Sequence, residues 1–98
     1  GGGANRPRQS WDGRYWFIDT KQPARILHFS SEGEKLAEEI TGETRDWKPT
    51  ALAFDHQGRL LIGDDGPRHQ VLFYDVITAP KRVSTFGVRG GIGVLLCR

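Results

Sequence analysis

Aspartates that directly follow apolar runs are the first candidates for chemistry in this chain. Asp19 follows residues 14–18, and Asp64 and Asp65 follow residues 59–63. Carboxylates that lie close together could act as a catalytic pair or hold a metal ion. The stretch 64–66, however, lacks the alternating oxygen ligands and the distal Glu of a calcium-binding loop. Asp19 and Asp64 occupy the same position of a 45-residue repeat described below. Because an active site rarely recurs in every repeat, we predict that both side chains accept backbone N–H groups in turns.

The histidines give no clear catalytic or metal-binding pattern. His28, His56 and His69 are far apart and lack the spacing of metal ligands. No Ser/His/Asp set can be assembled, and the glycine-rich stretch 87–93 misses both phosphate-loop patterns. We expect His28 to be a half-exposed strand residue. We therefore predict no catalytic residue, no metal and no cofactor, and the balance is against an enzyme.

Composition limits the remaining classes. The 98 residues, 37% hydrophobic and 27% charged, are typical of one small globular domain, and 13 glycines and 5 prolines predict many turns. No apolar run approaches the ~18 residues of a membrane helix. The net charge of +2 is too small to indicate nucleic acid. We therefore predict no membrane partner, and the charge argues against nucleic acid. Because the sequence has no methionine, we expect a fragment or a processed product.

An internal repeat becomes visible when the chain is shifted by 45 residues. Residues 12–19 then lie over residues 57–64, and residues 25–29 lie over residues 70–74. The apolar runs coincide in both segments. Identical residues occur at five pairs of positions: Gly13/Gly58, Arg14/Arg59, Asp19/Asp64, Leu27/Leu72 and Gly42/Gly87. Self-similarity at this period is typical of propellers and other repeat architectures.

Each repeat is predicted to form a small antiparallel sheet. In the second copy, turn residues separate four short runs rich in apolar and β-branched residues: 51–54, 59–63, 70–74 and 82–86. The first copy has matching runs at 14–19 and 25–29, but residues 5–10 are polar and basic and give no obvious innermost strand. The prediction is an all-β fold of β-propeller-like, four-stranded antiparallel blades that together form a partial propeller.

The conformation of residues 34–41 is open to two interpretations. Ser31 and Glu34 match a capping box, and Leu36 and Ile40 form an apolar pair at helical spacing. These features favour a helix when the segment is taken alone. The alignment with residues 81–86 favours a fourth strand, which is the interpretation adopted here.

The second copy also resembles a known repeat family. Residues 49–64 have a Pro, an apolar-Ala-apolar-Asp run, two variable residues, a Gly, an apolar strand and an Asp, a pattern similar to the NHL repeat. Residues 71–75 resemble the third strand of such repeats, although residues 67–70 depart from the usual Asn and basic residue. The resemblance implies a six-bladed propeller. A weaker similarity to SMP-30/gluconolactonase-type propellers implies a metal-dependent lactonase, but two blades cannot supply the converging ligands of those enzymes.

These features divide the chain into four parts. Residues 1–11 are predicted to be a flexible N-terminal segment, and residues 12–48 a first, incomplete blade. Residues 49–91 form the second blade, and residues 92–98 a C-terminal tail. Since a blade buries its faces only against neighbours, we expect neighbouring blades or self-association, and three copies could close a six-bladed ring.

One edge of the predicted sheets gathers the candidate binding residues. In an antiparallel meander, the loop that enters the first strand and the loop that joins strands two and three lie at the same edge, here called the rim. Asp46 is among the rim residues, and those predicted to bind are Asp19, Lys21, Arg45, Trp47, Asp64, Asp65, Arg68 and His69. Trp47 is the strongest candidate, because exposed aromatic side chains anchor interfaces. The alternative is that Trp47 packs between the blades.

The function that this pattern favours is a binding or scaffold module that presents the rim to a protein or a small-molecule ligand. One alternative is a fragment of a propeller hydrolase or lactonase whose metal site lies mostly outside this chain. A second alternative is an RNA-contacting NHL module, which the small net charge weakens. The sequence indicates neither the ligand nor the cellular compartment.

Overall fold

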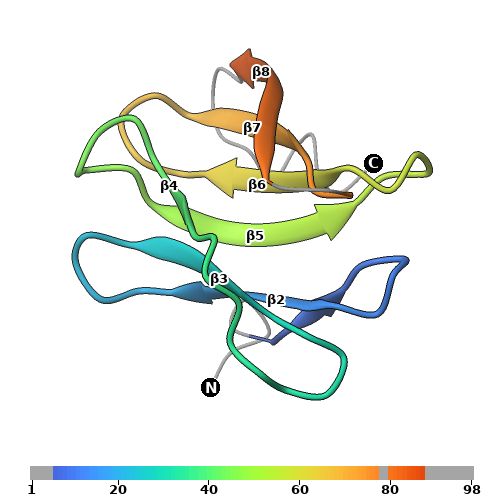
Figure 1. The fold of residues 1–98 in the computed structure, drawn as a ribbon. Helices are drawn as coiled ribbons and strands as arrows, with labels where there is room; N and C mark the ends of the chain where they lie inside the picture. Colours follow the sequence, from blue (N-terminus) through green and yellow to red (C-terminus); the bar gives the residue numbers. More distant parts are fainter. Residues whose placement is uncertain (1–5, 78–79, 88–98) are drawn as a thin grey trace.

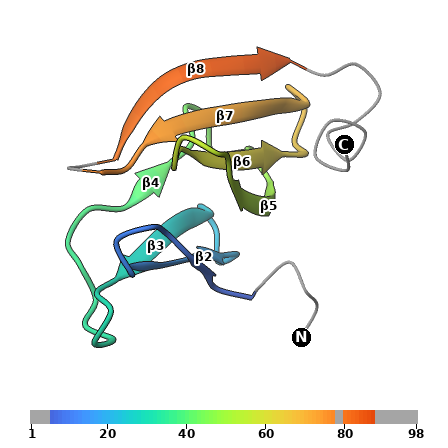
Figure 2. The same cartoon turned by 90° about the vertical axis from the view of Figure 1, so that its right-hand side faces the viewer.

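The computed structural model describes residues 6–77 and 80–87, and these residues form an all-β fold of two four-stranded antiparallel sheets. The N-terminal sheet has the order β1-β2-β3-β4, and the C-terminal sheet has the order β5-β6-β7-β8. The strands of the N-terminal sheet are β1 (Arg8–Gln9), β2 (Tyr15–Asp19), β3 (Arg25–Phe29) and β4 (Ile40–Thr41). Those of the C-terminal sheet are β5 (Pro49–Phe54), β6 (Leu60–Asp64), β7 (Gln70–Asp75) and β8 (Lys81–Gly87). Each sheet is a meander, and the two lie one above the other (Figures 1 and 2).

The 45-residue repeat is present in the register of the strands. In the first three strands of each sheet, every residue pair of one sheet has its counterpart 45 positions later in the other. Thus Tyr15 pairs with Phe29 as Leu60 pairs with Tyr74, and Gln9 pairs with Tyr15 as Phe54 pairs with Leu60. The fourth strand departs by one residue, since a bulge at Phe73/Tyr74 changes its register.

The turns between the first two strands also repeat. The amide of Ser10 donates to the carbonyl of Arg14 over 2.9 Å, and the amide of Asp55 donates to the carbonyl of Arg59 over 3.0 Å. Gly13 and Gly58 adopt positive φ angles of 90° and 79°, which only glycine tolerates without strain. The identical glycines found in the sequence therefore perform the same role in both turns.

Two predictions about the first repeat need correction. Residues 5–10 were not expected to supply an innermost strand, but Arg8 and Gln9 form β1 against β2. Their polarity concealed the strand because an edge strand is held by backbone hydrogen bonds and keeps much of its side-chain surface in solvent.

The segment 34–41 contains no helix, and the fourth strand is much shorter than predicted. Only Ile40 and Thr41 form β4, while Lys35 makes an isolated bridge to Phe29. The amide of Leu36 donates to the carbonyl of His28 over 2.9 Å, so the sheet edge takes backbone groups that a helix would have used. Pairing with β3 therefore outweighs the local helix propensity.

The core lies between the two sheets. It joins one face of the N-terminal sheet, here called its inner face (Trp16, Ile18, Ile26, His28 and Ile40), to the inner face of the C-terminal sheet (Leu52, Leu60, Ile62, Leu72 and Tyr74). Side chains alternate between the two faces along each strand. Because the two similar sheets turn opposite faces toward the shared core, the positions that point inward in one sheet correspond to positions that point outward in the other. No helix in the described part of the chain is long and apolar enough to cross a membrane.

His28 was expected to be half exposed, and this was wrong. Its side chain is 1% exposed, and its ring meets Trp16 edge to face with centroids 4.2 Å apart. Burial lowers the pKa of His28, and Arg14 lowers it further, whereas Glu38 opposes the shift. The ring is therefore a neutral core side chain at the position that Phe73 has in the second repeat.

The division into two repeats corresponds to the division into sheets. The connection 42–48 separates β4 from β5, and the predicted boundary between residues 48 and 49 falls at the start of β5. Residues 88–91 of the predicted second blade and the predicted tail 92–98 lie outside the described residues.

Candidate ligand-binding rim

Three loops meet at one end of the two sheets and form the rim. They are the β2–β3 loop (20–24), the β4–β5 loop (42–48) and the β6–β7 loop (65–69), all at the left in Figure 1. The amide of Asp65 donates to the carbonyl of Lys48 over 2.8 Å. This bond joins two of the three loops, and all eight predicted binding residues lie on the three loops or at the adjoining strand ends. Their role in binding stays a prediction.

Asp64 joins two of these loops from a buried position. Its Oδ1 accepts the backbone amides of Lys48, over 2.8 Å, and Gly66, over 2.9 Å, while its Oδ2 accepts the side-chain amide of Gln70 over 3.0 Å. A Cβ atom at Gly66 would lie 2.7 Å from the carbonyl oxygen of Asp46, so the loop closes tightly around this carboxylate. Asp64 therefore holds the rim together, as the turn-stabilising prediction stated, and is not a free ligand group.

Asp19 has the same role in a more open setting. It accepts the backbone amide of Lys21 and the guanidinium Nε of Arg25, both over 3.1 Å. These two hydrogen bonds, that of Lys21 first, lower the pKa of the Asp19 carboxyl. Arg25 also binds Glu39 over 3.0 Å, so the carboxylate belongs to an ion-pair network on the N-terminal sheet.

Trp47 is a core residue and not an exposed anchor. Its side chain is 3% exposed, and its indole Nε1 donates to the carbonyl of Ala24 over 2.7 Å. The ring packs against the backbone of Gly42, where a Cβ atom would come within 2.3 Å. Of the two interpretations of Trp47, packing between the sheets is therefore the one that the structure supports.

The remaining predicted residues lie on the exposed surface of the rim. His69 Nδ1 lies 3.5 Å from a carboxylate oxygen of Asp65. Arg68 binds Glu43 over 2.8 Å, and Arg82 pairs with the same carboxylate. Lys21 and Arg45 line separate shallow hollows of about 380 and 180 Å³. The structure therefore brings these residues to one end without joining them into one site.

A cleft of about 370 Å³ lies at the rim between the β2–β3 and β4–β5 loops. Its lining combines apolar side chains with polar edges: Ile18, Thr20, Gln22, Ala24, Asp46, Trp47, Lys48, Pro49 and Thr50. This size and mixture are typical of sites that take a small ligand or one side chain of a partner. Of the eight predicted binding residues, only Trp47 lines the cleft.

Sequence reasoning found the correct loops but the wrong positions within them. Thr20 and Gln22 flank the predicted Lys21 and face the cleft, whereas Lys21 borders another hollow. Pro49 and Thr50 were named only as the start of the repeat motif, ahead of the predicted strand 51–54. The available signal was the apolar pair Ile18 and Ala24 on either side of the β2–β3 loop, which marks where the loop covers the core.

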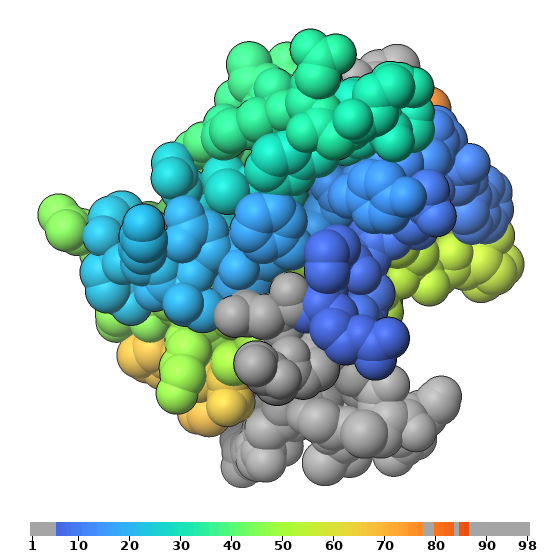
Figure 3. Space-filling model, turned by 90° about the horizontal axis from the view of Figure 1, so that it is seen from below, coloured from blue at the N-terminus to red at the C-terminus, as the bar shows by residue number. Residues whose placement is uncertain are grey.

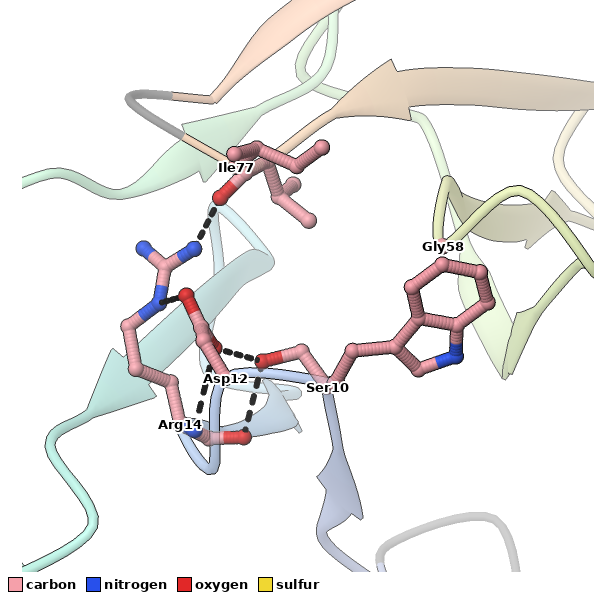
Figure 4. A pocket seen from close by; sticks show the side chains of 7 residues that line it. Ser10, Asp12, Arg14, Gly58 and Ile77 are labelled. Atoms are coloured by element: carbon pink, nitrogen blue, oxygen red, sulfur yellow. Dashed lines mark hydrogen bonds and ion pairs between the residues drawn. The ribbon is translucent and has the colours of Figure 1, made fainter.

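A second hollow, of about 260 Å³, lies at the opposite end of the sheets (Figure 4). Asp12 accepts hydrogen bonds from Ser10, over 2.6 Å, and from Nε of Arg14, over 2.8 Å. Arg14, held in place by Asp12, donates to the carbonyl of Val76, directly after β7 of the C-terminal sheet. This contact links the two sheets directly.

Within the described ranges, no group of three or more His, Cys, Asp or Glu residues could hold a metal ion. The chain matches no protein-family model, no curated protein and no solved structure. The similarity to NHL repeats and to lactonase-type propellers therefore stays a prediction from the residues alone.

Proposed function

We propose that the two sheets are blades of an NHL-like β-propeller and that the rim binds a protein or a small-molecule ligand. Two four-stranded meanders that repeat at 45 residues and stack face to face support the propeller. The rim cleft of about 370 Å³ is the observation that carries the binding function.

The lining of the cleft limits the chemistry of its ligand. Ile18, Ala24 and Trp47 supply apolar surface, and Lys48 and Asp46 place one charge of each sign at the edge. An apolar group with hydrogen-bonding edges, such as an aliphatic or aromatic side chain within a peptide, fits this arrangement. Asp64 and Trp47 fix the loops in place before binding, which reduces the entropy lost when a ligand is held.

A panel of capped tripeptides tests the proposal. Acetyl-Gly-X-Gly-amide, with X as Leu, Phe, Trp, Lys or Glu, is titrated into the isotopically labelled chain while amide resonances are followed by NMR. We expect the Leu, Phe or Trp peptide to shift the amides of Thr20, Gln22, Lys48 and Thr50, with weaker effects from Lys and Glu.

A pair of variants makes the test specific to the cleft. Thr20→Phe fills the mouth of the cleft from an exposed loop position and should abolish the shifts. Gln57→Phe, which introduces the same side chain on the exposed β5–β6 turn, should leave the peptide-induced shifts unchanged. The proposal fails if no peptide shifts these amides, or if the shifts persist in Thr20→Phe.

A further inference from the structure

We infer that a second copy of this chain stacks on the first by repeating the internal contact between the two sheets. Each sheet has an outer face opposite the core. In the N-terminal sheet this face carries Tyr15, Phe17, Leu27 and Phe29, and in the C-terminal sheet it carries Leu61, Gly63, Val71, Phe73 and Phe86. Leu27 and Val71 are already buried within the chain, at 8% and 0% exposure, whereas Tyr15 and Phe86 are the exposed members of the two faces.

The register identifies what these outer faces match. The outer residues Tyr15, Phe17, Leu27 and Phe29 are 45 positions before Leu60, Ile62, Leu72 and Tyr74, which form the inner face of the C-terminal sheet. The outer residues Leu61, Gly63, Val71 and Phe73 are 45 positions after Trp16, Ile18, Ile26 and His28, which form the inner face of the N-terminal sheet. The two outer faces are therefore the two halves of the internal interface.

Side-chain sizes in the outer pair compensate one another. Inside the molecule, the large Trp16 and Ile18 of the N-terminal sheet belong to the same core cluster as Leu60 and Ile62. On the outer face of the C-terminal sheet, the smaller Leu61 and Gly63 take the positions that correspond to Trp16 and Ile18. On the outer face of the N-terminal sheet, the larger Tyr15 and Phe17 take the positions that correspond to Leu60 and Ile62. The Phe17 ring stacks on Phe29 with 5.3 Å between centroids. The gain at Tyr15 and Phe17 offsets part of the volume lost at Leu61 and Gly63, and packed interfaces tolerate changes best when their volumes offset one another.

The view from below shows the side of the molecule to which the outer face of the N-terminal sheet belongs (Figure 3). Blue-to-teal residues of the N-terminal repeat occupy the upper and middle part of that view. At the opposite side, Phe86 in β8 is 52% exposed. Apolar residues on both sides of a small protein are a common mark of association.

Arg14 and Arg59, which occupy the same position in the two repeats and each bond an aspartate, support the stacking. Asp12 holds Nε of Arg14 at 2.8 Å, and Arg14 crosses to the carbonyl of Val76 in the next sheet. Asp55 holds Nε of Arg59 at 2.7 Å, and the Arg59 guanidinium lies 5.4 Å from the Phe73 ring centroid. The Arg14 side chain is 15% exposed, whereas that of Arg59 is 37% exposed.

The 45-residue offset also predicts which carbonyl accepts a hydrogen bond from Arg59. Ser31 lies 45 positions before Val76, so Arg59 of one copy should donate to the carbonyl of Ser31 in the next. Such a contact joins unlike faces, and contacts of this type extend or close into rings instead of stopping at a dimer. A second copy is the occupant because each of its outer faces uses the strand positions that form an inner face in the other repeat.

Sedimentation velocity of the 98-residue chain between about 1 and 200 µM tests this inference, a range chosen to span ordinary interface affinities. We expect concentration-dependent association beyond the dimer. Tyr15→Glu and Phe86→Glu each place a charge on one outer face at an exposed position, with 38% and 52% exposure. Each variant alone should be monomeric, because one of the two faces is lost.

An equimolar mixture of the two variants decides the geometry. Each retains the face that the other lacks, so the mixture should form a one-to-one heterodimer. His56→Glu, which makes a similar charge change on an exposed turn, should associate like the parent chain. Arg59→Gln should weaken association about tenfold or more, since a hydrogen bond from a charged group is lost.

Several results would overturn the inference. These are a parent chain that stays monomeric over the whole range, a single variant that still self-associates, and a mixture that forms no heterodimer while both variants keep the circular dichroism of the parent. Self-association of one variant would instead indicate that like faces meet.

Discussion

A Cβ atom at position 42 would lie 2.3 Å from Cγ of the Trp47 indole, so the ring of Trp47 fills the space that any side chain at Gly42 would need. The indole N–H at the same time donates to the carbonyl of Ala24 in the β2–β3 loop. The connection between the two sheets is therefore closed around one ring, which fixes the floor of the rim cleft.

Gly42→Ala should destabilise the fold strongly for this reason. The added methyl cannot be accommodated unless the Trp47 ring moves and its bond to Ala24 lengthens, and overpacking of this kind costs about 2–3 kcal/mol. Urea denaturation followed by tryptophan fluorescence measures the loss. Thr41→Ala, an exposed neighbour, is the control and should cost less than about 1 kcal/mol. Equal losses for the two variants would show that the ring does not limit position 42.

Trp47→Phe should separate the hydrogen bond of the ring from its volume. Phenylalanine keeps an aromatic ring but leaves the buried carbonyl of Ala24 without a donor, so we expect a loss of about 2–3 kcal/mol. Trp16→Phe is the matched control, because Trp16 Nε1 is buried and has no hydrogen-bond partner among the described residues. That substitution removes no bond and should cost clearly less in the same urea titration. If Trp16→Phe proves as costly as Trp47→Phe, ring volume alone explains both.

The two repeated aspartates should respond differently to substitution. Asp64→Ala leaves the buried amide of Gly66 and the partly buried amide of Lys48 without an acceptor, and should cost about 2–4 kcal/mol. Asp19→Ala removes a single backbone acceptor in an open loop and should shift the urea midpoint much less. Asp64→Asn retains an oxygen for the amides and should recover most of the loss. A larger effect at Asp19 than at Asp64 would contradict the role assigned to the buried carboxylate.

Local rules were sufficient where the residues repeat. Gly13 and Gly58 close equivalent turns, and Asp19 and Asp64 accept backbone amides after the second strand, so a shift of 45 residues located the second and third strands of both sheets. Strand β1 was missed because Arg8 and Gln9 carry no apolar signal.

Long-range packing was not readable from the sequence in the same way. Trp47 and Ala24 are 23 residues apart, and nothing in either segment announces their hydrogen bond. The sequence also does not state which face of each sheet turns inward. Because equivalent positions face opposite ways in the two sheets, His28 is buried while Phe73 lies on an outer face. The cleft residues depend on the same packing and were therefore mostly missed.

The buried His28 should make stability depend on pH. Burial lowers its pKa below the unfolded value near 6.5, so the unfolded chain binds a proton that the folded chain resists. The stabilising effect is therefore complete above pH 6.5 and is lost as pH falls below that value. One histidine can contribute a slope of at most about 1.4 kcal/mol per pH unit.

The groups around His28 sharpen this prediction. Arg14 and Lys35 add to the shift, while Glu38, whose carboxylate lies 3.5 Å from Nε2, opposes it. His28→Phe, which copies the second repeat, should remove the loss between pH 7.5 and 5.5 in urea denaturation. His56→Gln, on an exposed turn, should retain it. A pH dependence that survives His28→Phe would assign the effect to another group and remove the neutral, buried imidazole from the description of the core.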